Sequence, residues 1–336
     1  MKRTCSIFLF LVFLLVLSAG FSDSSEFPGN PLREKLERAI MTFPESVQGK
    51  LREIVLAGSF TGKIDKNDAE YLARKMGASS RQLMLDLVKI AKVYAKPPIS
   101  KFNVGAVCRG TSGNLYFGSN MEFAGQVLSF SVHGEQSATM NAWMHGESAI
   151  DTLAISAAPC GYCRQFLNEL RGTSNLTIVI PDAPALLLTD LLPHAFGPGD
   201  LDITARLMDH EEHNLALEHS SDEPVVLQAL AAAKASYAPY SGNFAGVAIL
   251  SKDGRVFTGR YAENAAFNPS MSPMQAALSQ FNMAARLYKE IERVVLVEVQ
   301  CGTSGQKRAA EYVLHSISTQ VKLEVFRARE KEKKIP

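Results

Sequence analysis

Two short motifs bring together residue types that bind transition metals. The first is His-Gly-Glu at 133–135, and the second is Pro-Cys-Gly-Tyr-Cys at 159–163. One histidine and two cysteines supply three ligands for Zn²⁺, and three protein ligands leave a fourth position open for water, as in catalytic zinc sites. The two thiolates also neutralise the formal charge of the ion. The sequence therefore predicts a catalytic zinc centre with His133, Cys160 and Cys163 as ligands.

Glu135 is placed to move protons at such a centre. It follows His133 by two positions, so on a helix the two side chains leave the same turn in different directions. The carboxylate can then stand beside the metal-bound water without ligating the metal. In that position it can take a proton from the water and deliver it to a substrate.

Other interpretations of these motifs stay open at this point. Cys160 and Cys163 alone fit a thioredoxin-like redox pair, which leaves His133, Glu135 and Pro159 unexplained. A structural zinc site would usually have a fourth ligand, and none lies nearby in the sequence. A buried histidine and two core thiols that meet by coincidence are the third alternative.

The pattern of apolar residues predicts the elements that must position the motifs. Strands are expected at 102–107, 115–118, 152–157 and 176–180, and helices at 135–145 and 160–170. Both His133 and Cys160 then lie at helix starts, where unpaired N–H groups and the helix dipole stabilise thiolates. The order of these elements indicates an α/β sandwich around a mixed sheet.

The same unit occurs a second time in the chain. Four residues recur at an offset of 141 positions, from Gly105, Gly113, Gly118 and Glu122 to Gly246, Gly254, Gly259 and Glu263. After a deletion of two residues, Gln136 aligns with Gln275. Three of the four matches are glycines of the kind that turns and close packing require. The chain is therefore expected to hold two copies of one α/β unit.

The second copy has lost the residues that do chemistry. In its frame Ser272 replaces His133 and Met274 replaces Glu135. Cys301 lies opposite Cys160, whereas Ser304 stands opposite Cys163. Neither the base nor a set of three ligands remains, so we call residues 223–336 the silent copy and residues 97–209 the catalytic copy.

Changes in amino-acid composition and apolar pattern divide the rest of the chain into segments. We expect a leader at 1–20, a polar linker at 21–30, a helical region at 31–96 that ends at two prolines, and a second linker at 210–222. A cluster at the junction of the copies, Asp-His-Glu-Glu-His at 209–213, could hold a second metal. The cluster is not set in an apolar pattern that would bury it, so we expect a solvated linker there.

The leader has the pattern of a secretory signal peptide. Lys2 and Arg3 precede the apolar run 7–17, and Ser-Ala-Gly follows at 18–20. A single membrane anchor is the alternative, although a helix over 5–21 would be only ~25 Å long against a ~30 Å hydrocarbon core. A wrongly assigned translation start is the third interpretation.

Composition excludes several classes of protein. The chain has 336 residues, 46% of them hydrophobic, so intrinsic disorder is not expected. Its net charge is +1, and removal of the leader changes the balance to 33 basic against 34 acidic residues. A nearly neutral charge argues against the electrostatic binding of nucleic acid, which needs clustered lysine and arginine. Five cysteines are too few for a disulfide scaffold of this size.

In these motifs the chain resembles a cytidine deaminase, of the two-domain homodimeric bacterial type. His-x-Glu followed by Pro-Cys-x-x-Cys is the signature of the zinc nucleobase deaminases. The resemblance runs from about Pro31 to at least His315. Its blocks are Ser100–Ala106, Tyr116–Phe123, His133–Gln136, Pro159–Phe166, Ala195–Leu201 and Tyr261–Pro269.

The resemblance implies a duplicated three-layer α/β/α fold with a mixed sheet. It also implies one Zn²⁺ per subunit and hydrolytic deamination of cytidine and 2′-deoxycytidine in pyrimidine salvage. Glu135 would be the proton shuttle. The residues that bind the nucleoside would be Phe102 against the pyrimidine, Asn120, Met121 and Glu122 around the ribose, and Phe196 closing the pocket.

The same resemblance implies a homodimer with its active site near the subunit interface. The segment Tyr261–Pro269 of the silent copy is expected to line the partner subunit's pocket. The family is expected in the cytoplasm, whereas the leader predicts export, or membrane attachment if it stays uncleaved. One departure is Gly134, where the family commonly has alanine; glycine there costs up to ~1 kcal/mol of helix stability.

Two rival functions remain from the sequence. One is a zinc deaminase for another base or nucleoside, and the other is a zinc-binding interaction protein without turnover. The neutral charge and the Asn120 and Glu122 pair argue against a polynucleotide substrate. An intact Glu135 beside an open coordination position argues against a protein without turnover.

Overall fold

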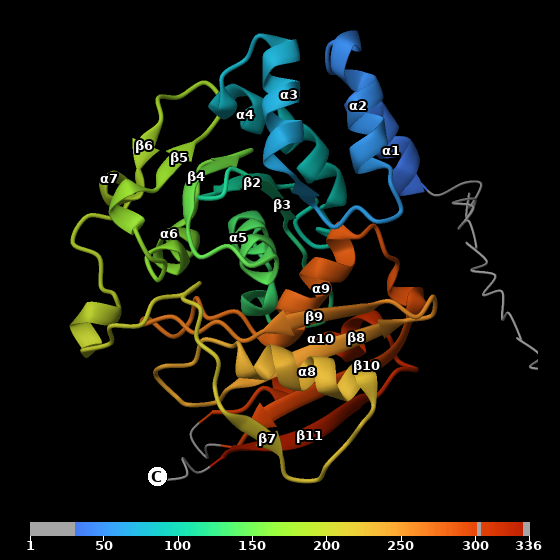
Figure 1. The fold of residues 1–336 in the computed structure, drawn as a ribbon, viewed down its shortest axis with the longest axis vertical. Helices are drawn as coiled ribbons and strands as arrows, with labels where there is room; N and C mark the ends of the chain where they lie inside the picture. The colour runs from blue at the N-terminus through green and yellow to red at the C-terminus, as the bar shows by residue number, and fades with distance from the viewer. Residues whose placement is uncertain (1–30, 301–303, 332–336) are drawn as a thin grey trace, which may run out of the picture. The chain divides into compact units, whose positions relative to one another are not determined.

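A computed structural model describes residues 31–300 and 304–331. The predicted leader, the linker at 21–30 and Cys301 lie outside these described residues. Within them, every helix is too short or too polar to cross a membrane. Figure 1 shows the arrangement of the helices and strands.

The region before the catalytic copy is mostly helical, as its apolar spacing predicts. It contains α1 (Pro31–Ile40), α2 (Glu45–Val55), α3 (Lys66–Met76) and α4 (Ser80–Ala91). Gly77 ends α3 in the left-handed conformation, and the Ser79 side chain caps the start of α4. The sequence did not predict the short strand β1 (Lys63–Ile64), which pairs antiparallel with β3 and so joins the sheet of the catalytic copy.

The first sheet has six strands in the order β1-β3-β2-β4-β5-β6. Its further strands are β2 (Gly105–Gly110), β3 (Leu115–Ser119), β4 (Ile150–Ile155), β5 (Thr177–Val179) and β6 (Leu186–Leu187). β4 and β5 run parallel, and the other neighbours are antiparallel, so the sheet is mixed. β3 is buried along its whole length because α4 covers one face of the sheet and α5 (Gly134–Met144) covers the other.

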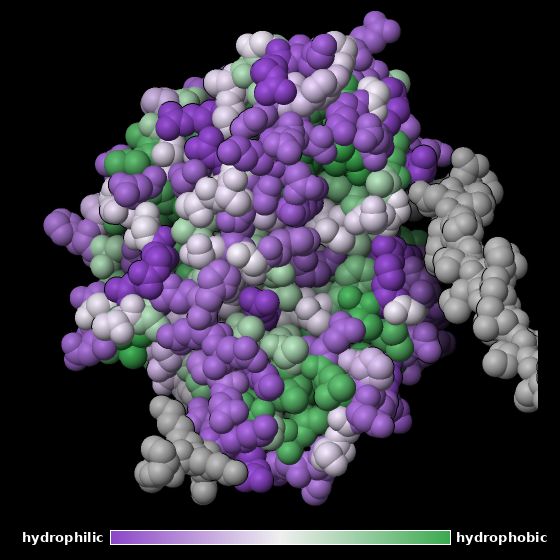
Figure 2. Space-filling view, in the orientation of Figure 1, coloured by the Kyte–Doolittle hydropathy of each residue, from purple (hydrophilic) through white to green (hydrophobic). Residues whose placement is uncertain are grey.

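The second sheet has five strands in the order β7-β11-β10-β8-β9. They are β7 (Leu215–Leu217), β8 (Ala245–Ser251), β9 (Val256–Arg260), β10 (Ile291–Val299) and β11 (Leu323–Glu330). α8 (Pro224–Lys234) and α9 (Pro273–Met283) cover its two faces, with α10 (Lys307–Ile317) beside α9. Apolar side chains gather near α8 on the face shown in Figure 2, where Leu227 is 44% exposed.

The two sheets confirm the duplication that the repeated glycines predict. β3 and β9 begin 141 positions apart, as do β4 and β10, while α5 and α9 begin 139 positions apart. Gly118 and Gly259 show why glycine recurs. A Cβ atom on Gly118 would lie 2.1 Å from the Ala138 nitrogen in α5, and one on Gly259 would lie 2.2 Å from the Ala277 nitrogen in α9. Each helix thus packs directly on the backbone of its strand.

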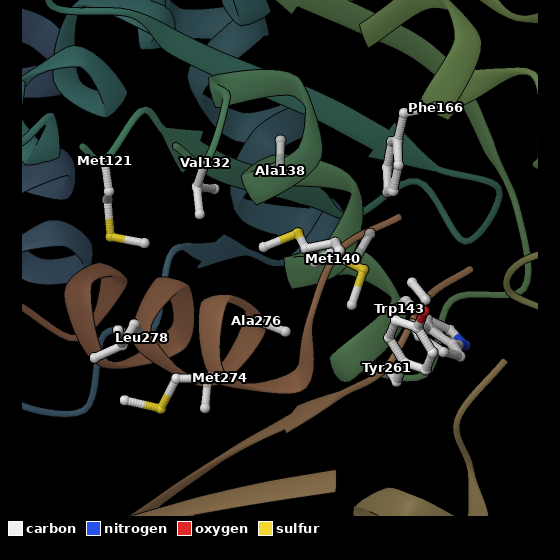
Figure 3. Close-up of a cluster of buried hydrophobic side chains, with 14 of the residues drawn as sticks. Met121, Val132, Ala138, Met140, Trp143, Phe166, Tyr261, Met274, Ala276 and Leu278 are labelled. Atoms are coloured by element: carbon white, nitrogen blue, oxygen red, sulfur yellow. The ribbon is translucent and has the colours of Figure 1, made fainter. Parts of the chain in front are cut away.

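The core of the protein lies where the two copies meet. α5 and α9 pack against each other between the sheets (Figure 1), and almost every residue of both helices is buried. Figure 3 shows Met140 and Trp143 of α5 in the same cluster as Met274 and Leu278 of α9. Burial on all sides explains why neither helix has a clear apolar stripe in the sequence.

Candidate active site

The two predicted metal-binding motifs meet at the starts of two helices. His133 precedes α5, Cys160 precedes α6 (Gly161–Leu167), and Cys163 lies in the first turn of α6. Nδ1 of His133 lies 3.5 Å from Sγ of Cys160, and the two sulfur atoms are 3.7 Å apart. One ligand atom from each residue lies within 4.8 Å of the others.

These separations fit a tetrahedral zinc ion. With Zn–S bonds of about 2.3 Å and Zn–N bonds of about 2.0 Å, two sulfur ligands are about 3.8 Å apart and a sulfur and a nitrogen about 3.5 Å apart. The observed distances agree with both values, and no disulfide joins Cys160 to Cys163. A redox pair of cysteines would not explain why a ligand atom of His133 lies so close to both sulfur atoms. The His/Cys/Cys group therefore suits Zn²⁺ with one position left open.

The electrostatics of the group favour metal binding and proton transfer. Hydrogen bonds from Cys163 and then His133 lower the pKa of the Cys160 thiol to about 3, so this sulfur is a thiolate. Burial raises the pKa of Glu135, which is 5% exposed and hydrogen-bonded to Cys163. A raised pKa makes this carboxylate a stronger proton acceptor than an ordinary glutamate, which suits it to general acid–base catalysis.

A cavity of about 470 Å³ opens beside His133 and Cys160. This volume is in the range that small-molecule ligands occupy. Its walls include four residues that the sequence predicts at the site, namely Phe102, Asn120, Glu122 and Glu135, together with His133 and Cys160. The cavity is also lined by residues to which the sequence analysis assigned no role, including Ile99, Ser100, Val104, Ala157 and Ala158.

Asn120 holds the loop that carries Phe102. Its Oδ1 accepts a hydrogen bond from the Val104 nitrogen at 2.8 Å, and its Nδ2 donates to the Phe102 carbonyl at 2.9 Å. These bonds replace strand pairing, which is why β2 begins at Gly105 and the strand predicted from 102 starts three residues late. Phe102 is consequently 58% exposed at the cavity wall.

Glu122 holds the other end of this loop. Its Oε2 accepts hydrogen bonds from the Ile99 and Ser100 nitrogens at 2.8 and 2.9 Å, and its Oε1 accepts from the Ser100 hydroxyl. Burial acts to raise the pKa of Glu122, but these hydrogen bonds outweigh it and lower the pKa. The repeat contains a signal for the missed serine, because Ser241, 141 positions after Ser100, makes the same contacts to Glu263.

Two residues predicted to bind substrate lie away from the cavity. Met121 is fully buried in the core (Figure 3), and its backbone pairs with Val132, so the structure gives it a packing role in place of a substrate contact. Phe196 is 45% exposed, and its carbonyl accepts hydrogen bonds from the side chains of Gln165 and Asn168 at 2.8 and 3.0 Å. It does not line the cavity of this subunit.

The aromatic ring of Tyr162 covers the metal ligand His133. The two rings are stacked, with centroids 5.2 Å apart and planes inclined by 28°. The sequence predicted no role for Tyr162, and only its position between the two cysteine ligands could have drawn attention to it. The stacked ring restricts rotation of the imidazole.

The remaining candidate metal residues do not form a second centre. Ser272 caps α9, and Met274 is fully buried, so the silent copy has packing residues where the catalytic copy has ligands. At the junction, Asp209 pairs with Arg171 and the His213 ring stacks on Phe244. Among residues 31–300 and 304–331, the only group with the spacing of metal ligands is His133, Cys160 and Cys163.

Comparisons with known proteins agree with this geometry. Two family models described as "cytidine and deoxycytidylate deaminase zinc-binding region" match residues 78–179 and 188–311. The chain is 43% identical over 287 residues to a cytidine deaminase of Shewanella halifaxensis, covering 85% of this chain and 96% of the relative. It is 40% identical over 290 residues to a cytidine deaminase of Vibrio vulnificus, covering 86% and 98%.

A solved structure of cytidine deaminase from Mycobacterium tuberculosis matches a smaller part of the chain. It aligns at 30% identity with a TM-score of 0.32, covering 34% of this chain and 96% of that one. The alignments cover nearly the whole length of the two relatives, and each family match includes most of the strands of one sheet. The chain therefore belongs to the zinc-dependent cytidine and deoxycytidylate deaminase family.

Proposed function

We propose that this protein hydrolyses cytidine and 2′-deoxycytidine to uridine and 2′-deoxyuridine, with release of ammonia. The observation that carries the proposal is the buried Glu135 beside three ligand atoms at tetrahedral zinc spacing, in the wall of a cavity of about 470 Å³. An enzyme with these products serves pyrimidine salvage.

Glu135 is the residue that moves protons in this reaction. When bound by His133, Cys160 and Cys163, Zn²⁺ lowers the pKa of a coordinated water and makes it nucleophilic. Glu135 takes a proton from the attacking water as the new C4–O bond forms and passes it to N3 of the pyrimidine. It then takes the remaining proton from the new C4 hydroxyl and delivers it to the amine as the C4–N bond breaks, so that ammonia leaves, C4 becomes a carbonyl and the carboxylate is regenerated.

The loop between Ile99 and Val104 orients the nucleoside. Phe102 offers a flat apolar wall to the pyrimidine. Asn120 and Glu122 fix that loop through both ends. Glu122 is also placed to bind a ribose hydroxyl, because within the described part of the chain its Oε1 is hydrogen-bonded only to the rotatable Ser100 hydroxyl. The same two residues would thus shape the pocket and contact the sugar.

A second subunit completes the pocket in our proposal. Val127 and Leu128 beside the cavity are 61% and 70% exposed, and Phe196 and Phe267 are 45% and 67% exposed. Apolar side chains with this exposure favour an interface. Of the segment Tyr261–Pro269, residues 261–265 and Pro269 are buried in their own subunit, so only the exposed residues 266–268 of the partner are assigned to the wall opposite Phe102. Sedimentation of the purified protein tests the dimer, and a monomer with full activity would refute this part of the proposal.

The domain division and the leader also stay as proposals. We assign the catalytic copy to 97–209 and the silent copy to 223–336, with 210–222 between them. β7 lies inside that linker and pairs with β11, so the linker contributes an edge strand to the second sheet. N-terminal sequencing of the natural protein would test whether residues 1–20 are cleaved, which in turn separates export from a cytoplasmic location.

The activity is tested with the purified full-length protein and cytidine. We expect the absorbance change of the pyrimidine and the release of ammonia together, and loss of both after treatment with a chelator. Cys160→Ala should lose zinc and turnover, whereas Glu135→Ala should lose turnover and keep zinc. Turnover only with another base or nucleoside would favour that substrate, and zinc binding with no turnover on any would favour an interaction protein.

A further inference from the structure

Gln136 connects the zinc ligand His133 to the silent copy. It lies in the first turn of α5 and is 2% exposed. Its Oε1 accepts a hydrogen bond from the His133 backbone nitrogen at 3.2 Å. Its Nε2 donates to the Pro269 carbonyl, also at 3.2 Å, across the boundary between the copies.

The silent copy makes the mirror-image contact. Gln275, the counterpart of Gln136, accepts from the Ser272 nitrogen at 3.0 Å and donates to the Phe130 carbonyl at 2.7 Å. Phe130 and Pro269 are themselves counterparts, 139 positions apart. Gln136 in α5 and Gln275 in α9 thus each attach the start of their own helix to the other copy. Only the start of α5 carries a predicted metal ligand.

The same segment of the silent copy also holds the second ligand helix. Asn264 donates to the Gln165 carbonyl in α6 at 3.0 Å. The Ala265 nitrogen donates to Glu169 at 2.9 Å, and the Tyr237 hydroxyl donates to the same carboxylate at 2.7 Å. Glu169 follows the end of α6 and is fully buried. Residues 264–269 therefore contact both helices that present zinc ligands.

From these contacts we propose that Gln136 is a positioning residue for His133, and that it acts by anchoring the start of α5 to Pro269 of the silent copy. The zinc site itself is the one assigned under the proposed function, on which this inference rests. Groups that orient metal ligands without touching the metal typically change metal affinity about 10- to 100-fold when they are replaced. A loss of that size is expected here, because Gln136 ties the backbone of His133 to the silent copy through its two hydrogen bonds.

Two substitutions separate the anchor from the helix cap. Gln136→Ala removes both hydrogen bonds. Gln136→Glu, measured at a pH where the side chain is ionised, keeps an acceptor for the His133 nitrogen, since glutamate also serves at this position of a capping box, but the carboxylate cannot donate to the Pro269 carbonyl. Ser279→Ala is the matched control, because it removes another buried hydrogen bond between the copies, the 2.7 Å contact with Ser137.

The measurements are zinc affinity by chelator competition, the absorption spectrum of the Co²⁺-substituted protein, and the melting temperature of the metal-free protein. We expect both Gln136 variants to bind zinc about 10-fold or more weakly and to change the Co²⁺ spectrum. Ser279→Ala should lower the melting temperature and leave zinc affinity and spectrum unchanged. If Gln136→Ala does not fold, Gln136→Glu carries the test.

Two results would overturn the inference. If Gln136→Glu has the zinc affinity and Co²⁺ spectrum of the wild type, only the hydrogen bond to the His133 nitrogen matters for zinc binding. If Ser279→Ala loses as much zinc affinity as the Gln136 variants, the cause is a general loosening of the interface between the copies. A wild-type protein that binds no zinc would instead refute the proposed function, so the two failures can be told apart.

Discussion

Gly118 and Gly259 provide a test of site positioning with a control in the same chain. Each lies on the second strand of its copy, directly beneath a central helix. A Cβ atom on Gly118 would lie 2.1 Å from the Ala138 nitrogen and 2.5 Å from the Gly134 carbonyl oxygen. A Cβ atom on Gly259 would lie 2.2 Å from both the Ala277 nitrogen and the Pro273 carbonyl oxygen. Alanine therefore creates nearly the same overlap in both copies.

The size of the effect follows from this overlap. Ordinary contact begins near 3.4 Å, so the helix must withdraw by about 1 Å in either variant, at a cost of about 1–3 kcal/mol from overpacking. In Gly118→Ala the displaced helix is α5, which presents His133 and Glu135. A displacement of about 1 Å at reacting groups can reduce the rate about 100-fold. In Gly259→Ala the displaced helix is α9, which presents no ligand.

The assay compares unfolding, zinc content and kcat/KM with cytidine for the two variants, at a temperature where both are folded. We expect similar losses in the free energy of unfolding. We expect kcat/KM to fall about 100-fold in Gly118→Ala and to stay within a few-fold of wild type in Gly259→Ala. Equal losses of kcat/KM in the two variants would refute the reasoning, because catalysis would then follow stability rather than the position of α5.

Three further outcomes are expected. Glu135→Gln should reduce kcat about 100-fold or more with zinc retained on metal analysis; near-normal turnover would exclude Glu135 as the proton shuttle. Phe102→Ala should raise KM for cytidine about 5-fold, as expected for about 1 kcal/mol of lost aromatic contact, and unchanged KM would place the base elsewhere. Burial lowers the pKa of Lys96 from 10.5 to about 8, so between these values the unfolded chain binds more protons and the stability contribution of Lys96 rises with pH. The melting temperature of Lys96→Met should lack that rise, and parallel pH curves for wild type and variant would contradict it.

The zinc group could be predicted from the sequence because its chemistry depends on residue type. A histidine and two cysteines at helix starts have few other uses in this pattern, and the structure brings their ligand atoms within 4.8 Å. The central helices and strands were predictable for a second reason. The chain contains two copies of the unit, so each of these elements has two matching sequence segments. Gly118 and Gly259 carry the same packing constraint in both copies.

The parts that could not be predicted depend on partners that are distant in the sequence. β1 and β6 have two residues each, too few to show any periodicity, and they exist because a neighbouring strand edge is free to pair. The start of β2 depends on Asn120, whose amide captures the loop before it. Met121 is different, since it lies between Asn120 and Glu122 in an extended segment. Alternation along such a segment directs it to the opposite side, which is the core.

The lost and retained residues of the silent copy point to one role for it. Ser272 and Met274 have replaced a ligand and a base, yet Glu263 still holds Ser241 as Glu122 holds Ser100. The retained contacts are those that fold the unit, and the lost residues are those that would react. Nearly every residue of α5 is buried, and one sheet can cover only one side of a helix. The catalytic copy on its own would expose the other side of the helix that presents His133 and Glu135. A second copy that packs but does not react supplies that cover, because α9 lies along α5 and residues 264–269 hold both ligand helices.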